Sequence, residues 1–134
     1  MTNHPGPARA SVDEIDEIRL TLPALAPYAR VARLAITGLA SRNGFTSDEV
    51  EDLRIATGEA FGVLVTGATD DDQIRFTCRL RADALEVDVE RLPARPLVDL
   101  AELSGQILEA VVDEVTVDRT IGRIRTVKRQ QEAR

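Results

Sequence analysis

The sequence predicts a two-layer α/β sandwich, in which three amphipathic helices cover one face of a mixed, mostly antiparallel sheet. First, its 134 residues are the length of one domain, and a hydrophobic content of 43% is enough to build a single core. Second, segments that alternate apolar and polar residues, typical of strands, are interspersed with segments whose apolar residues recur at helical spacing. Third, consecutive strand segments are separated by short turns, which favours hairpins.

The first strand and the first helix lie near the N-terminus. Ile18, Leu20 and Leu22 alternate with polar residues, and this alternation stops at Pro23. A helix is predicted over residues 27–42, because proline suits the first helical position. Apolar residues then recur at helical spacing, at Val31, Leu34, Ala35 and Leu39.

A second helix is predicted from Thr46 to about Thr66. Thr46 and Glu49 have the spacing of a capping box, in which each side chain bonds to the backbone N–H of the other residue. The apolar face of this helix carries Val50, Leu53, Ala56, Ala60 and Leu64. The three aspartates that follow, at 70–72, are expected to form a solvated turn.

Two charged strands are predicted next. Residues 74–81 and 85–90 both alternate, with arginines between the apolar residues of the first segment and acidic residues in the second. A hairpin would place these opposite charges across from each other. Cys78 lies on the apolar side of its strand and is expected in the core.

The C-terminal third predicts one helix and two strands. Asp99 and Glu102 mark a helix start, and the helix is expected to run to about Val112. Its expected buried residues are Leu103, Ile107, Ala110 and Val111. Strands then contain Val115 and Val117, and Ile121, Ile124 and Thr126, before a charged tail that begins at Lys128. We therefore expect a leader at 1–16, one domain at 17–130 and a tail at 131–134.

Composition excludes several classes of function. A net charge of −6 repels a phosphate backbone, so general nucleic-acid binding is not expected. A single cysteine, Cys78, and a single histidine, His4, cannot form a Cys/His metal cluster. Apolar runs are too short to span a membrane, and the N-terminus lacks a signal pattern. We expect no metal and a cytoplasmic location.

Four motifs in order resemble one family. The segment at 50–60, VEDLRIATGEA, resembles the second helix of the RsbW/SpoIIAB group of bacterial anti-sigma factors, which are GHKL (histidine-kinase-like, Bergerat-fold) ATPases. Arg30 falls where the family has an arginine on its first helix. The run at 105–115, GQILEAVVDEV, follows the family's last helix, and the final strand at 122–124 completes the pattern. The likeness covers about residues 18–129.

The resemblance also locates where this sequence departs from the family. It implies that Glu59 holds the position of a general base that acts on a serine hydroxyl, and that the magnesium ligand, an asparagine, would stand at position 63. Here that residue is Val63, whose side chain offers no oxygen. The family's D-x-G-x-G motif is replaced by VERLPA at 89–94, so only Glu90 and Gly105 remain as candidate nucleotide contacts. The segment before Ser104 is also too short for a phosphate-covering lid.

These departures predict little or no kinase activity, because phosphoryl transfer depends on a metal, positioning and electrostatic stabilisation. Glu59 is then a relic carboxylate, and no cofactor is expected. The family arginine that matches Arg30 contacts both the sigma factor and its rival, so Arg30 and its neighbour Arg33 are our candidate partner-binding residues.

The leading hypothesis is an anti-sigma factor that sequesters an alternative sigma factor and is released by an anti-anti-sigma protein with a STAS domain. The family's members often form homodimers, and we expect the same here. The first alternative is an active serine kinase that uses ATP with magnesium to phosphorylate the STAS antagonist, with Glu59 as its base. A second alternative is a GHKL-like domain that binds a different protein.

Overall fold

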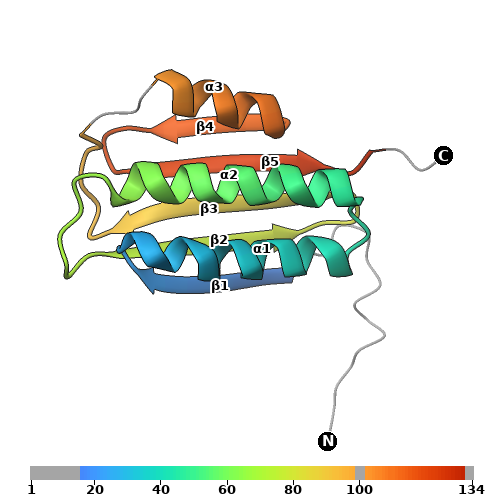
Figure 1. The fold of residues 1–134 in the computed structure, drawn as a ribbon, viewed down its shortest axis with the longest axis horizontal. Coiled ribbons are helices and arrows are strands. Elements are labelled where there is room, and N and C mark those ends of the chain that lie inside the picture. Colours follow the sequence, from blue (N-terminus) through green and yellow to red (C-terminus); the bar gives the residue numbers. More distant parts are fainter. Residues whose placement is uncertain (1–15, 99–101, 132–134) are drawn as a thin grey trace, which may run out of the picture.

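The computed structural model describes residues 16–98 and 102–131 (Figure 1). Its elements are β1 (Asp16–Pro23), the 3-10 turn η2 (Ala26–Tyr28), α1 (Ala29–Arg42), α2 (Ser47–Val65), β2 (Gln73–Leu80), β3 (Ala84–Leu92), α3 (Glu102–Val111), β4 (Glu114–Asp118) and β5 (Arg123–Arg129). The helices and strands expected from the sequence are present, and the expected helix start at Asp99 lies outside the described residues. Most of the expected leader and tail, at 1–15 and 132–134, lies outside the described residues, and Asp16 already belongs to β1.

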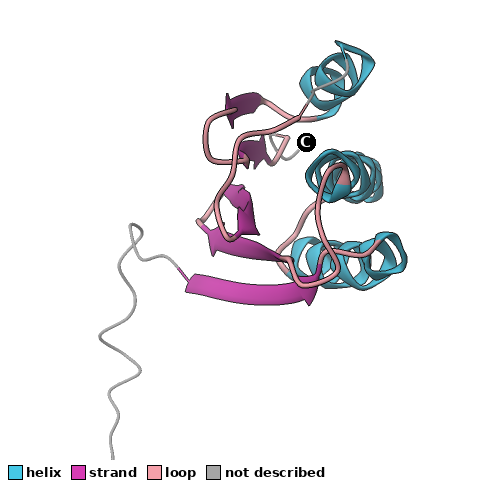
Figure 2. Ribbon diagram, turned by 90° about the vertical axis from the view of Figure 1, so that its left-hand side faces the viewer, coloured by secondary structure: helices cyan, strands magenta, loops and turns pink. Residues whose placement is uncertain are grey.

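The strands form one sheet in the order β1-β2-β3-β5-β4. Figure 2 shows this sheet on one side and the helices on the other, so the predicted two-layer sandwich is confirmed. The expectation of a mixed sheet is wrong, because every neighbouring pair of described strands is antiparallel. The chain reaches the edge strand β4 through α3 and then turns back into β5, beside β3.

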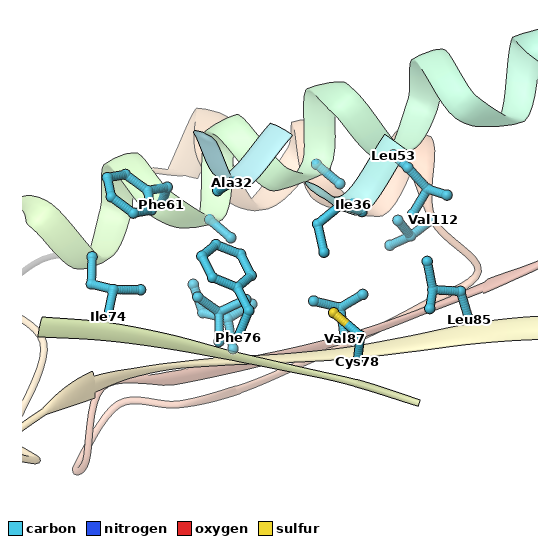
Figure 3. Close-up of a cluster of buried hydrophobic side chains, with 14 of the residues drawn as sticks. Ala32, Ile36, Leu53, Phe61, Ile74, Phe76, Cys78, Leu85, Val87 and Val112 are labelled. Carbon is cyan, nitrogen blue, oxygen red and sulfur yellow. The ribbon is translucent and has the colours of Figure 1, made fainter. Parts of the chain in front are cut away.

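The core lies between the sheet and the helices, as Figure 3 shows. Phe61 on α2 stacks on Phe76 of β2, with ring centroids 6.2 Å apart. Cys78 is buried beside them in the sheet, as predicted, and burial raises the pKa of its thiol to about 12. The inward-facing apolar residues of β2 and β3 thus form the sheet side of the core.

The helix α1 buries a different face from the one its largest apolar residues suggested. Its buried side chains are Ala32, Ile36 and Ala40, at a spacing of four residues. Val31 and Leu34 instead remain 41% and 67% exposed. Small alanines on the inner face let α1 approach the rest of the core closely, and the larger side chains are left on the outer surface.

The start of α2 has the predicted capping box. The Thr46 hydroxyl accepts a hydrogen bond from the Glu49 N–H at 3.2 Å, and the Glu49 carboxylate accepts one from the Thr46 N–H at 2.7 Å. Glu49 is buried and also accepts a hydrogen bond from the backbone N–H of Gln131. The first turn of α2 is therefore tied to the end of the chain.

The predicted buried face of α3 is partly wrong, since Ile107 and Val111 are half-buried but Leu103 and Ala110 are not. Leu103 is 65% exposed and Ala110 is also exposed, whereas Leu108 is fully buried. The inner face runs through Ser104, Leu108 and Val111, at i, i+4 and i+7. Since α3 lies at the edge of the helical layer against α2, its inner face is narrow, and its first member is polar.

The outer face of the sheet carries the predicted charge pairing. Arg75 pairs with Glu90 at 3.1 Å across the β2–β3 hairpin. The buried Asp88 bridges Arg79 at 3.0 Å and Arg123 at 3.1 Å. These ion pairs link β2, β3 and β5 and help to specify their register.

Two charged residues are more buried than expected. Lys128, expected to begin a charged tail, lies within β5 and donates hydrogen bonds of 2.9 Å to Asp52 and to the Val111 carbonyl. Asp72, assigned to a solvated turn, is 4% exposed, unlike its exposed neighbours Asp70 and Asp71. Hydrogen bonds from Arg95, followed by those from Thr69, hold the pKa of the Asp72 carboxyl well below its usual range.

Candidate functional site

Glu59 lies in the second half of α2, on the side that faces α3. Its side chain is half-buried, and its carboxylate accepts a hydrogen bond of 2.7 Å from the hydroxyl of Ser104. Sequence reasoning did not select Ser104, because a single serine on an amphipathic helix carries no signal of its own. The contact means that the candidate base position is already engaged by a hydroxyl of the same chain.

Val63 follows Glu59 by one helical turn and points into the core. It is 7% exposed and belongs to the main hydrophobic cluster. Magnesium requires hard oxygen ligands in near-octahedral geometry, which a buried isopropyl group cannot supply. Residues 59 and 63 therefore do not fit a magnesium-bound nucleotide in the way that the sequence resemblance would require.

The structure separates Glu90 from the other candidate nucleotide contact. Glu90 lies on the outer face of the sheet, paired with Arg75, because Val87 and Val89 take the inward positions of β3. Gly105 lies on α3 next to Ser104, and a Cβ there would meet no atom within 4 Å. Gly105 thus lies near Glu59, whereas Glu90 is on the opposite side of the sheet.

The candidate partner-binding arginines differ in exposure. Arg30 is exposed, and it is flanked on α1 by the exposed side chains of Val31 and Leu34. The guanidinium of Arg33 lies across Gly58 of α2, where an added Cβ would be 2.6 Å from its Nη2 atom. We call Arg30, Val31, Arg33 and Leu34 the α1 surface. It combines two cationic and two apolar side chains.

Comparison with known proteins points to one group. No family model matches the chain. Over 77 residues it is 42% identical to the serine-protein kinase RsbW of Listeria monocytogenes serotype 4a (strain HCC23), a match that spans 55% of this chain and 49% of that protein. It is 28% identical over 130 residues to the serine-protein kinase RsbW of Bacillus velezensis, which covers 81% of each chain.

The fold agrees with these matches. The crystal structure of the RsbU and RsbW domains of Rv1364c from Mycobacterium tuberculosis superposes with a TM-score of 0.69 at 20% identity, covering 89% of this chain and 34% of that one. The chain is therefore similar to RsbW proteins in sequence and shares their fold. It spans about half the length of the Listeria relatives that it matches, so the match there concerns only part of those proteins.

A recess of about 170 Å³ opens on the outer face of the sheet, lined by Thr116, Asp118, Arg123 and Arg125. Pockets for small molecules usually hold roughly 300–1,000 Å³. Both arginines are also committed to ion pairs, Arg123 with Asp88 and Arg125 with Glu86.

Two further findings concern the described residues. Among residues 16–98 and 102–131, His, Cys, Asp and Glu side chains do not gather in groups of three that could hold a metal ion. Over the same ranges, the helices are too short or too polar to cross a bilayer.

Proposed function

We propose that this RsbW-like domain is a protein-binding regulator of the anti-sigma type. It sequesters an alternative sigma factor in the cytoplasm, and an anti-anti-sigma protein with a STAS domain releases that factor by competing for the same surface. The α1 surface is the observation that carries the proposal, because exposed arginine and aliphatic side chains together are typical of interface anchors.

Binding of this kind needs surface complementarity and no chemistry. A stable interface buries about 1,200–2,000 Å² in total, which is larger than one helix face supplies. Arg30, Val31 and Leu34 would therefore form the anchor of a larger contact. Arg30 places an exposed positive charge on a chain whose net charge is −6, and this local charge would attract an acidic partner segment to α1.

The state of Glu59 supports binding over catalysis. Its carboxylate is occupied by Ser104, and Val63 removes the metal ligand one turn later. A general base alone contributes about 10²–10⁴-fold to a rate, which cannot replace a missing metal and its positioning. We therefore propose that the domain needs neither ATP nor magnesium to bind its partner.

An active serine kinase is the second candidate, because the matched relatives are named serine-protein kinases. It would phosphorylate the STAS antagonist with Glu59 as the base. Incubation of the purified domain with magnesium, labelled ATP and a STAS-domain protein of the source organism would show phosphoserine if this candidate is correct.

The binding proposal is tested by affinity capture in nucleotide-free buffer. Tagged wild-type chain and the variant Arg30→Ala are expressed in the source organism, and captured proteins are identified by mass spectrometry. We expect a sigma factor that is enriched with the wild type and depleted at least about tenfold with Arg30→Ala, as for a hot-spot arginine. Arg42→Ala, at the other end of α1, is the matched control and should capture it normally.

Capture without any sigma factor, or equal capture by Arg30→Ala, contradicts the proposal. The homodimer expected from the family resemblance is part of the same proposal, and light scattering on the purified chain measures it directly. A mass of about twice 14.6 kDa supports the dimer.

A further inference from the structure

Arg91 is an arginine in the interior of the fold. It is 1% exposed and heads the fully buried side chains by volume. It occupies an inward position of β3, one residue after the outward-facing Glu90. Among the described residues, its partners are backbone carbonyls, and it forms no ion pair with a carboxylate.

The carbonyls come from two separate parts of the chain. Arg91 Nη1 donates to the carbonyls of Leu64 at 3.0 Å and Thr66 at 3.1 Å, at the C-terminal end of α2. Its Nη2 donates to the carbonyl of Pro96 at 2.9 Å, with a longer contact of 3.4 Å to that of Arg95. The planar guanidinium thus joins the end of α2 to the segment 93–98 after β3.

The end of α2 suits a cation. The last carbonyls of a helix have no partners within the helix, and they carry the negative end of the helix dipole. A fixed fork of donors satisfies two of them at once. The bonds are needed, because a buried cation without partners is strongly destabilising. Burial, followed by repulsion from Arg95, lowers the pKa of the Arg91 guanidinium.

The segment 93–98 is held at other points too. Arg95 pairs with the buried Asp72, with 3.2 Å between Nη1 and Oδ1. The N–H of Leu97 donates to the carbonyl of Arg119 at 2.8 Å. Gly122, at a φ of +70°, lies so close that an added Cβ would be 2.9 Å from the Arg95 carbonyl oxygen.

We propose that Arg91 is an internal latch, whose guanidinium occupies a cage of four carbonyl oxygens and holds segment 93–98 against the end of α2 without a bound ligand. The latch holds in place the part of the chain where the sequence resemblance would put glycines that contact a nucleotide. The inference concerns the domain alone and does not depend on the identity of its partner.

Amide hydrogen exchange, followed residue by residue by NMR on the full chain, tests the latch. In the wild type, the Leu97 N–H should exchange at least about 100-fold more slowly than an unstructured amide, because its acceptor stays in place. Addition of millimolar ATP and magnesium should leave that rate unchanged. A Leu97 amide that exchanges like free chain, or that ATP slows, would overturn the proposal.

The variant Arg91→Lys separates the effect of the forked guanidinium group from the effect of its positive charge. Lysine keeps a cation but cannot bond both pairs of carbonyls at once. We expect the Leu97 amide to exchange at least about tenfold faster in this variant, while the Arg81 N–H, bonded to Ala84 at the far hairpin turn, changes less than about twofold. Unchanged Leu97 exchange, or equal acceleration at Leu97 and Arg81, contradicts a local latch. If the variant does not fold, the exchange rates of the wild-type Leu97 amide, with and without ATP and magnesium, decide the proposal.

Discussion

The hydroxyl of Ser104 lies 2.7 Å from the carboxylate of Glu59 and donates a hydrogen bond to it. This contact joins α3 to α2 at the position that, by sequence resemblance, corresponds to the base of a serine kinase. A serine of the same chain thus donates to one oxygen of this carboxylate. Val63 is buried one turn later. At this position, α2 and α3 are held together by side chains of the same chain.

Loss of this hydrogen bond should weaken the packing of α3. The variant Ser104→Ala leaves a half-buried carboxylate without its protein donor, and we expect the free energy of unfolding to fall by about 1 kcal/mol. Urea denaturation followed by circular dichroism measures the change. Ser41→Ala, at an exposed position on α1, is the control and should change stability by less than about 0.5 kcal/mol. Equal stabilities of the two variants would show that the contact contributes nothing.

Two glycines of α2 should respond differently to alanine. Gly62 has open space around an added Cβ, so Gly62→Ala should stabilise the domain by about 0.5–1 kcal/mol. At Gly58 the same Cβ meets the guanidinium of Arg33, so Gly58→Ala should stabilise less and should displace Arg33. Thermal unfolding of both variants, repeated with Arg33→Ala, measures the difference. A difference that survives the removal of Arg33 contradicts this role of Gly58.

Stability should depend on Asp72 at acid pH. Because the pKa of Asp72 is lower in the folded chain than in the unfolded chain, its contribution is complete above about pH 4 and is lost as the pH falls. Wild-type chain should therefore lose stability between pH 4 and pH 2 more steeply than Asp72→Asn does. Urea midpoints across this range give the two slopes. Asp71→Asn, at the exposed neighbour, should keep the wild-type slope.

Cys78 should be inert in the folded protein. The thiol is 2% exposed, and burial raises its pKa to about 12, so little reactive thiolate forms at pH 8. We expect a thiol-specific reagent to label the native chain slowly and the urea-unfolded chain at once. Rapid labelling of native protein would place Cys78 outside the core.

Much of the fold could be predicted because its signals are local. The alternation in β2 and β3 and the capping box of α2 each depend on residues within one element. The buried face of α3 could not be predicted in this way. Its inner stripe begins with the polar Ser104, and the reason for a serine there is Glu59, which is 45 residues away in the sequence.

The same limit applies to the buried charges. Asp72 looks like one of three solvated aspartates until Arg95 is placed beside it by the fold. Arg91 looks like a solvated residue at a strand end, because nothing in the sequence shows that the C-terminal end of helix α2 lies against it. Position 63, in contrast, was informative at once, since a valine side chain has no atom that could ligate a magnesium ion in any fold.

Calorimetric titration of the purified domain with ATP in the presence of magnesium tests the central claim most directly. The account predicts no heat of binding up to millimolar nucleotide, because Val63 replaces the metal ligand and Ser104 occupies Glu59. Saturable binding in the micromolar range would show a working nucleotide site and would contradict it.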